Sequence, residues 1–279
     1  MPTIKYHDLT TLEEFAQVVE LEREIWGVGY GDVVPVPIFA VTVKRGGILA
    51  GAFDGDRMIA FVYSLPAIKE GTTTQWSHML GVLDAYRSAG VGVALKLLQR
   101  DRALAMGIDL IEWTYDPLQA FNAHLNFARL GVVAHEYEEN IYGASTSVLH
   151  RGNPTDRFVA EWWIRKPHVE RRIGGPKLVV RAHDVASAPH ANRVGGSQEC
   201  AEVNLTLVAR RILVEIPVGF TEMLASAPDR AMHWRLATRE IFTTYFARGY
   251  RAVDFSLDRA NGKGAYLLEA PTQIRSAGL

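Results

Sequence analysis

The sequence predicts an α/β fold built on a mixed sheet, followed by a smaller α/β extension. The prediction rests first on residues 76–107, which read as a buried strand, a tight turn and a helix. Trp76 to Leu83 is apolar, aromatic or small, as expected for a strand covered on both faces. From Val91 to Met106, apolar residues recur at helical spacing. A strand at Ile108–Tyr115 follows, and because a helix joins the two strands they are expected to be parallel.

The elements ahead of this stretch follow from local signals. Cap residues between Asp8 and Thr11 begin a helix, and glycine ends it after Trp26. A turn at Asp54-Gly55-Asp56 separates two apolar runs and indicates a hairpin. The expected elements are a strand at Thr3–His7, helices at Leu12–Trp26 and Ile38–Arg45, hairpin strands at Ile48–Phe53 and Met58–Leu65, and a loop bracketed by Pro66 and Gly71.

The chain after Tyr115 alternates helix and strand again. Asp116-Pro117 begins a helix at Leu118–Leu130, which Gly131 ends, and a strand is expected at Val132–Tyr142. This completes a first domain at 1–147. The extension at 148–279 repeats the strand–helix–strand order and is interpreted as a smaller α/β unit that resembles a degenerate second copy. Its expected strands are Arg157–Ile164, Lys177–Arg181, Leu205–Pro217, Ala252–Leu257 and Ala265–Glu269, with a helix at Asp229–Tyr250.

The turn between the central strand and its helix is the candidate binding site. Glycine lets the backbone turn sharply and approach a ligand closely. The first amides of a helix lack internal partners, and the helix dipole adds to their attraction for an anion. A pyrophosphate is therefore the expected ligand, although glycines in such a turn also have a purely steric explanation. The turn consists of Arg87, Ser88, Ala89, Gly90, Val91 and Gly92.

Composition and charge exclude several classes of function. The formal net charge of −1 gives no global attraction to nucleic acid or to an anionic membrane. Cys200 is the only cysteine, which excludes an internal disulfide and a cysteine-built metal site. The sequence shows neither a signal-peptide pattern nor a run of about 18 apolar residues. We therefore expect a cytoplasmic protein that uses no metal.

The residues around the turn resemble the acetyl-CoA signature of the GNAT (GCN5-related N-acetyltransferase) family. Leu80-Gly81-Val82 followed by Arg87-Ser88-Ala89-Gly90-Val91-Gly92 is similar to the strand and RxxGxG/A loop of that family, and Phe127–Val132 is similar to its closing YxKLGF segment. The resemblance covers about residues 3 to 145. It implies a sheet that is splayed at its centre and acetyl-CoA as co-substrate. The implied reaction transfers an acetyl group to a primary amine of a small molecule or amino acid by direct attack in a ternary complex.

The resemblance also implies where the ligands bind. The pantetheine arm is expected between the two parallel strands, against the backbone of Leu80 and Val82, with Asn122 contacting the same arm. Trp26 and Tyr30 are expected in the wall of the acceptor pocket, and Glu112 within reach of it. Ordinary core aromatics and a salt bridge are the competing explanations for these three residues.

The catalytic groups depart from the family pattern. Some members carry a glutamate where this chain has His78, whose unperturbed pKa near 6.5 suits a general base; a histidine that is merely hydrogen-bonded in the sheet is the alternative. The tyrosine that protonates the leaving thiolate in many members is replaced by Phe127, which has no proton to donate. Tyr115, Tyr137 or a water are the remaining candidates.

Two further functions stay open. A tRNA-dependent aminoacyl transferase of the same fold is suggested by the second copy and by basic and aromatic residues between Arg151 and Arg181. A non-catalytic acyl-CoA sensor is suggested by Phe127. The sequence favours a small-molecule amine as partner over nucleic acid or membrane, and it leaves a homodimer open.

Overall fold

The structure, a computed structural model, describes residues 4–27, 29, 31–87, 89–143, 152–174 and 187–271. Their contacts divide the chain into two compact units. Unit 1 comprises Met1–Thr114, Ala144–Gly152 and Glu161–Glu170, and unit 2 comprises Tyr115–Gly143, Asn153–Ala160 and Arg171–Leu279. The units therefore do not follow the expected domain limits at 147 and 148, which remain a prediction.

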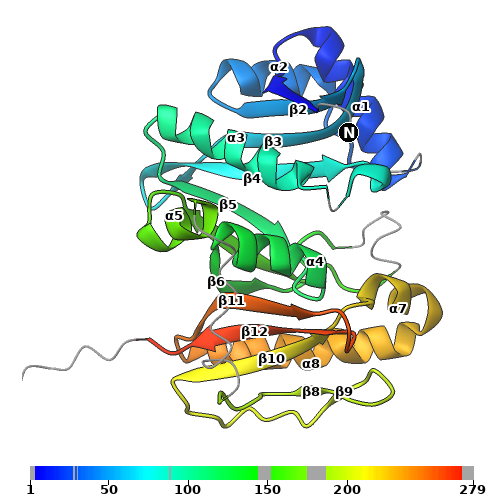
Figure 1. The fold of residues 1–279 in the computed structure, drawn as a ribbon, viewed down its shortest axis with the longest axis vertical. Coiled ribbons are helices and arrows are strands. Elements are labelled where there is room, and N and C mark those ends of the chain that lie inside the picture. The colour runs from blue at the N-terminus through cyan, green and yellow to red at the C-terminus, as the bar shows by residue number, and fades with distance from the viewer. Residues whose placement is uncertain are drawn as a thin grey trace, which may run out of the picture. The chain divides into compact units, whose positions relative to one another are not determined.

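Unit 1 is a mixed sheet with the strand order β1-β2-β3-β4-β5, followed by the C-terminal end of β7. The helix α3 runs along β3 and β4 in Figure 1. The mixed α/β architecture predicted from the sequence is confirmed. Its elements are β1 (Lys5–Asp8), α1 (Leu12–Trp26), α2 (Val36–Lys44), β2 (Ile48–Asp54), β3 (Arg57–Lys69), β4 (Thr72–Val82), η1 (Asp84–Tyr86), α3 (Val91–Ala105) and β5 (Leu110–Tyr115).

The helices α1 and α3 pack on opposite faces of β4. A Cβ at Gly81 would lie 2.8 Å from Ile25 Cδ1 and 3.2 Å from Trp26 Cη2, so glycine is what lets α1 approach this strand. The neighbouring Leu80 and Val82 face α3, where they meet Gly92 at 3.7 and 3.8 Å from its ideal Cβ position. Alternation along β4 thus presents one set of residues to each helix.

The start of α1 is set by a capping box at Thr11, which lies within the predicted cap residues Asp8 to Thr11. The Glu14 amide donates to Thr11 Oγ1 at 3.2 Å, and the Thr11 amide donates to Glu14 Oε2 at 2.9 Å. The helix ends at Gly27, whose φ of +105° is unfavourable for other residues.

The prediction of a loop between Pro66 and Gly71 is wrong. The strand β3 continues through Pro66 to Lys69, and β4 begins at Thr72 after a two-residue turn. The last pair between β2 and β3 is Ile48 with Ser64, so β2 does not extend alongside Pro66. A proline without an N–H is tolerated where a strand has a free side.

Unit 2 contains the strand order β7-β6-β11-β12-β10, of which β7 contributes its N-terminal end. The remaining elements of the chain are α4 (Ala120–Ala123), η2 (His124–Leu130), β6 (Val133–Glu138), β7 (Arg157–Trp163), α5 (Pro167–Gly174), β8 (Arg193–Val194), β9 (Cys200–Ala201), β10 (Arg211–Pro217), α7 (Phe220–Ser226), α8 (Pro228–Ala247), β11 (Arg251–Asp258) and β12 (Lys263–Glu269).

Phe158 and Arg235 anchor the interior of unit 2. The Phe158 ring lies 4.6 Å from Phe242 and 5.5 Å from Tyr266, centroid to centroid. Arg235 on α8 is 1% exposed and donates to both carboxylate oxygens of Asp116 at 2.8 and 2.6 Å. A buried pair with this bidentate geometry holds both charges in one position.

One topology occurs twice in the chain. The elements β5, α4 with η2, β6 and β7 form a strand–helix–strand–strand series in which the last strand lies between the first two. The elements β10, α8, β11 and β12 form the same series with the same order. The resemblance of the extension to a second copy stays a prediction, and this repeated strand order is consistent with it.

Several expected elements of this half differ in extent. The helix expected at 118–130 is a short α-helix continued by the π-helical η2, the strand expected at 205–217 begins only at Arg211, and α7 was not expected. The strand expected at Lys177–Arg181 lies outside the described residues. Within the described ranges, none of the helices combines the length and the apolar content that crossing a bilayer requires.

Candidate functional site

The strands β4 and β5 pair at one end and part at the other. Their parallel register contains two pairs, Gln75 with Ile111 and Trp76 with Glu112, although both strands continue beyond them. The parting begins beside a β-bulge, because Tyr63 of β3 pairs with Met79 while the next residue of β3 pairs with Ser77. Such a bulge bends and twists its strand. The predicted splay at the centre of the sheet is confirmed.

The turn after β4 is open. Gly90 caps α3 with a φ of +85°, a left-handed conformation that favours glycine, and a Cβ there would meet nothing within 4 Å. The preceding Ala89 is exposed. Within the described chain, the amides of Val91, Gly92 and Val93 have no hydrogen-bond acceptor. The helix therefore presents free N–H groups at an unobstructed corner, whereas Ser88 lies outside the described residues.

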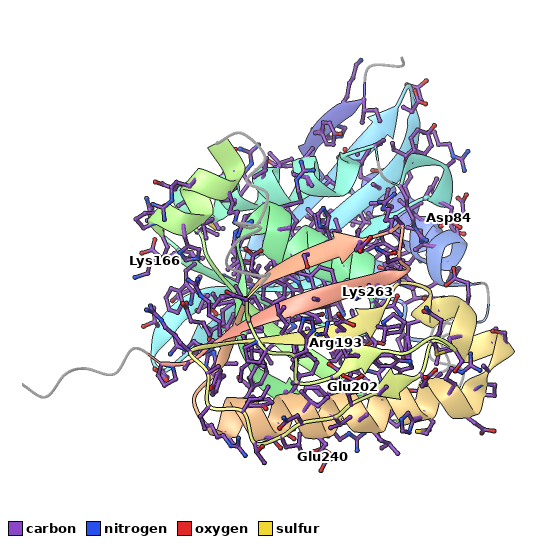
Figure 2. The ribbon with its side chains drawn as sticks, turned by 60° about the horizontal axis from the view of Figure 1, so that its bottom comes forward. Asp84, Lys166, Arg193, Glu202, Glu240 and Lys263 are labelled. Carbon is purple, nitrogen blue, oxygen red and sulfur yellow. The ribbon has the colours of Figure 1, made fainter. Side chains whose placement is uncertain are left out.

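Arg87 adds a positive charge beside this corner. Its guanidinium pairs with Asp84 at 2.7 Å and donates to the Val82 carbonyl oxygen at 3.3 Å, and its side chain remains 57% exposed. Figure 2 labels Asp84, the first residue of η1, where the chain leaves β4. The turn is fixed further by the Tyr86 hydroxyl, which donates to Asp54 at 2.7 Å.

His78 is the extra residue of the bulge and lies on the face of β4 that carries α1 and α2. Its ring stands 6.0 Å from the Tyr63 ring at an interplanar angle of 86°, and the Tyr63 hydroxyl donates to Thr42 of α2 at 2.9 Å. The surrounding protein displaces water from the imidazole and lowers the pKa of His78, although part of the residue stays exposed. A neutral imidazole at pH 7 can accept a proton.

Glu22 is a member of this site that the sequence reasoning missed. It is fully buried on α1; one carboxylate oxygen accepts from the Val34 amide at 2.8 Å, and the other, Oε1, has no partner among the described residues. Burial raises the pKa of Glu22 to about 7. Burial also raises the pKa of Tyr63, and the charge of Glu22 adds to that shift. A signal was present, because Glu22 falls on the stripe formed by Phe15, Val18 and Ile25, where an apolar residue is expected.

Two predicted pocket residues of unit 1 have structural partners. Trp26 is half-buried and meets Phe61 edge-on at 6.0 Å. The Glu112 carboxylate accepts from Lys69 Nζ at 2.6 Å, which is the salt bridge that the sequence left as the competing explanation. Tyr30 lies outside the described residues.

The other predicted residues, Tyr115, Asn122 and Tyr137, belong to unit 2. Tyr115 and Tyr266 share a hydrogen bond of 3.2 Å, and the Tyr137 hydroxyl donates to Asp156 at 2.7 Å. Burial raises the pKa of both Tyr115 and Tyr137. Asn122 is exposed. The roles of these three residues in a reaction remain predictions.

The part of the chain that the structure describes contains no group of three His, Cys, Asp or Glu residues arranged to hold a metal ion.

No protein-family model and no curated protein matches the chain. Among solved structures, it is similar to an acetyltransferase from Acinetobacter baylyi ADP1, with 13% identity and a TM-score of 0.49, over 60% of this chain and 95% of that one. It is also similar to NAA60 from Arabidopsis thaliana in complex with a bisubstrate analogue, with 14% identity and a TM-score of 0.46, over 58% and 98%. A GNAT-family acetyltransferase from Streptococcus pneumoniae gives 13% identity and a TM-score of 0.46, over 57% and 98%. Identities and TM-scores this low do not by themselves assign an activity to the chain.

The buried carboxyl of Glu22 gives a prediction for stability against pH. The folded state raises its pKa from 4.5 to about 7, so folding favours the protonated form, and the associated stability is lost as the pH rises from 4.5 through 7. We expect Glu22→Gln to escape this loss and to gain up to about 3 kcal/mol in unfolding free energy over wild type across that interval. Urea unfolding at a series of pH values measures the difference.

Glu24→Gln is the matched control, because Glu24 lies on the same helix with its side chain 51% exposed. It should shift stability by less than about 1 kcal/mol at every pH. A constant difference between wild type and Glu22→Gln from pH 4.5 to 7.5 would show that Glu22 is ionised normally.

Proposed function

We propose that unit 1 binds acetyl-CoA and that the protein is a GNAT-type N-acetyltransferase acting on a primary amine of a small molecule or amino acid. The observation that carries the proposal is the parting of β4 and β5 beside an open helix N-terminus. The two features together suit a ligand with a diphosphate at one end and a thin, amide-containing arm at the other.

The diphosphate would bind the free amides of Val91, Gly92 and Val93, with Arg87 adding charge. The pantetheine arm would run along the unpaired edge of β4, past Val82 and Leu80, where strand backbone offers hydrogen bonds to its amides. The bulge at His78 lies five residues before Leu83, about 17 Å along an extended strand. An extended pantetheine arm spans a distance of this order, so the thioester would reach the bulge.

His78 would accept the proton of the attacking amine. The nitrogen lone pair then forms a bond to the thioester carbon, and the carbonyl oxygen becomes an oxyanion that free backbone N–H groups of the splayed strand stabilise. Holding amine and thioester on either side of the bulge makes the attack effectively unimolecular. The Tyr63 ring meets the His78 ring edge-on, and Glu22 lies near enough to Tyr63 for its charge to act on the phenol.

A non-catalytic acyl-CoA sensor is the second candidate. Phe127, at the position of the usual proton donor, is fully buried against Tyr266 with ring centroids 5.6 Å apart. A sensor binds acetyl-CoA and never releases thiol, so a thiol-release assay across a panel of amines separates the two functions.

Gly90→Trp should abolish binding of acetyl-CoA, with at least a 100-fold loss of affinity by calorimetry, because the indole would fill the corner where the diphosphate binds. Gly71→Trp is the matched control. Gly71 also has a positive φ, +77°, and open space around it, but it lies in the turn at the other end of β4. Both variants place a side chain at a positive φ, which L residues adopt only with strain. Equal affinity of the two variants for acetyl-CoA would show that the diphosphate does not bind at Gly90.

His78→Ala should lower kcat/KM about 100-fold at pH 7 and change its pH dependence. In wild type the rate should rise with pH through the lowered pKa of His78 and then level off, because only the neutral imidazole accepts a proton. In the variant the rate should keep rising toward the pKa of the amine, near 10. His7→Ala, which removes an exposed histidine from β1, should leave the profile unchanged. If the pH profiles of kcat/KM for wild type and His78→Ala overlap, His78 is not the general base.

A further inference from the structure

A buried lysine without a counter-ion lies under the candidate site. Lys96 of α3 is 2% exposed, and it contacts no carboxylate of the described residues. Its Nζ donates to Ser77 Oγ at 2.8 Å and to Gln99 Oε1 at 3.1 Å, and it lies 3.6 Å from the centre of the Trp113 ring. Charged side chains are almost never buried unless they are paired, so this position calls for an explanation.

The lysine marks the point where the two strands part. The last pair of β4 and β5 is Trp76 with Glu112. The next residue on β4 is Ser77 and the next on β5 is Trp113, and Lys96 Nζ contacts both. The Lys96 side-chain nitrogen therefore contacts both β4 and β5 at the point where the two strands separate, on the face of the sheet that α3 covers.

The hydrogen bonds at this vertex leave one donor free. Ser77 Oγ accepts from Lys96 Nζ at 2.8 Å and from Gln99 Nε2 at 3.1 Å. A hydroxyl has two acceptor sites and one proton to donate. Both acceptor sites are occupied, so the proton must point away from Lys96 and Gln99, and no acceptor for it occurs among the described residues. An unused donor on a residue that is only 5% exposed is costly unless a ligand accepts it.

We propose that the Ser77 hydroxyl, backed by Lys96, donates its proton to the sulfur that leaves during acyl transfer. This inference rests on the proposed function. It assigns to Ser77 the role of proton donor to the leaving thiolate, which Phe127 cannot fill. As the C–S bond breaks, its electron pair goes to sulfur. The sulfur takes the proton of Ser77 Oγ, and Ser77 Oγ takes a proton from Lys96. His78 holds the proton of the amine, so protons and charges balance, and solvent exchange returns His78 and Lys96 to their starting states.

The surroundings of Lys96 suit this role. Burial lowers the pKa of its ammonium well below the usual value, because no anion compensates the charge. An ammonium of lowered pKa gives up its proton more readily than an ordinary lysine does. A lysine of ordinary pKa would release its proton too reluctantly to serve as the source.

The test uses CoA itself as the probe and needs no knowledge of the acceptor. The ultraviolet absorbance of the thiolate, followed against pH with CoA bound to the full chain, gives the pKa of the bound thiol. In wild type it should lie below the value of free CoA, because the donated hydrogen bond stabilises the thiolate. Ser77→Ala should raise it by about one unit, a tenfold change in the ionisation constant, and Lys96→Met by at least as much. The affinity for CoA should stay within about threefold in each variant.

Ser64→Ala is the matched control. Ser64 is the fully buried partner of Ser77 in the sheet, and its hydroxyl donates to Gln75 at 2.7 Å, away from Lys96. Ser64→Ala should leave the pKa of the bound CoA thiol unchanged. A thiol pKa that is the same in wild type, Ser77→Ala and Ser64→Ala, with CoA bound to all three, would overturn the Ser77 proposal and leave the transferase proposal standing. Absence of CoA binding to wild type would overturn both.

Discussion

The bulge at His78 is the constraint on which the rest of unit 1 depends. One extra residue in β4 breaks the regular pairing with β3, bends the strand, and takes it away from β5 after two paired positions. Without that parting, the backbone groups along both strand edges would bond each other. The bulge, the unpaired part of β4 and the start of α3 follow one another along the chain from His78 to Gly90.

The bulge also sets which polar side chains lie on each face of the sheet. His78 meets Tyr63 on the side of α1 and α2, whereas its neighbour Ser77 meets Lys96 on the side of α3. In a regular strand, consecutive residues already face opposite sides, and the extra residue shifts which of them reaches each helix. In the proposed reaction, a proton is accepted on one face and donated on the other, with the thioester between them. Gly81 keeps α1 close enough to β4 to close the first face.

Unit 2 is held by a different kind of interaction. Its centre combines the aromatic rings around Phe158 with the buried ion pair of Arg235 and Asp116. Its strands β10, β11 and β12 and the helix α8 repeat the strand–helix–strand–strand order of β5, α4 with η2, β6 and β7. Tyr115 and Tyr137 serve this interior through their hydrogen bonds, which is why neither hydroxyl is free in the structure.

Local signals were enough to predict α1, α3 and the turn between β4 and α3. The capping box at Thr11 involves groups three residues apart, and Gly90 needs only its own backbone conformation. The family resemblance added the splay. The sequence reasoning missed Glu22, the pairing of Lys96 with Ser77, and the passage of β3 through Pro66. These features depend on burial and on strand register, which are fixed by contacts between distant segments. The pKa of a carboxylate or an ammonium departs far from its ordinary value only when the fold removes water from the group. The tertiary structure therefore determines these shifts.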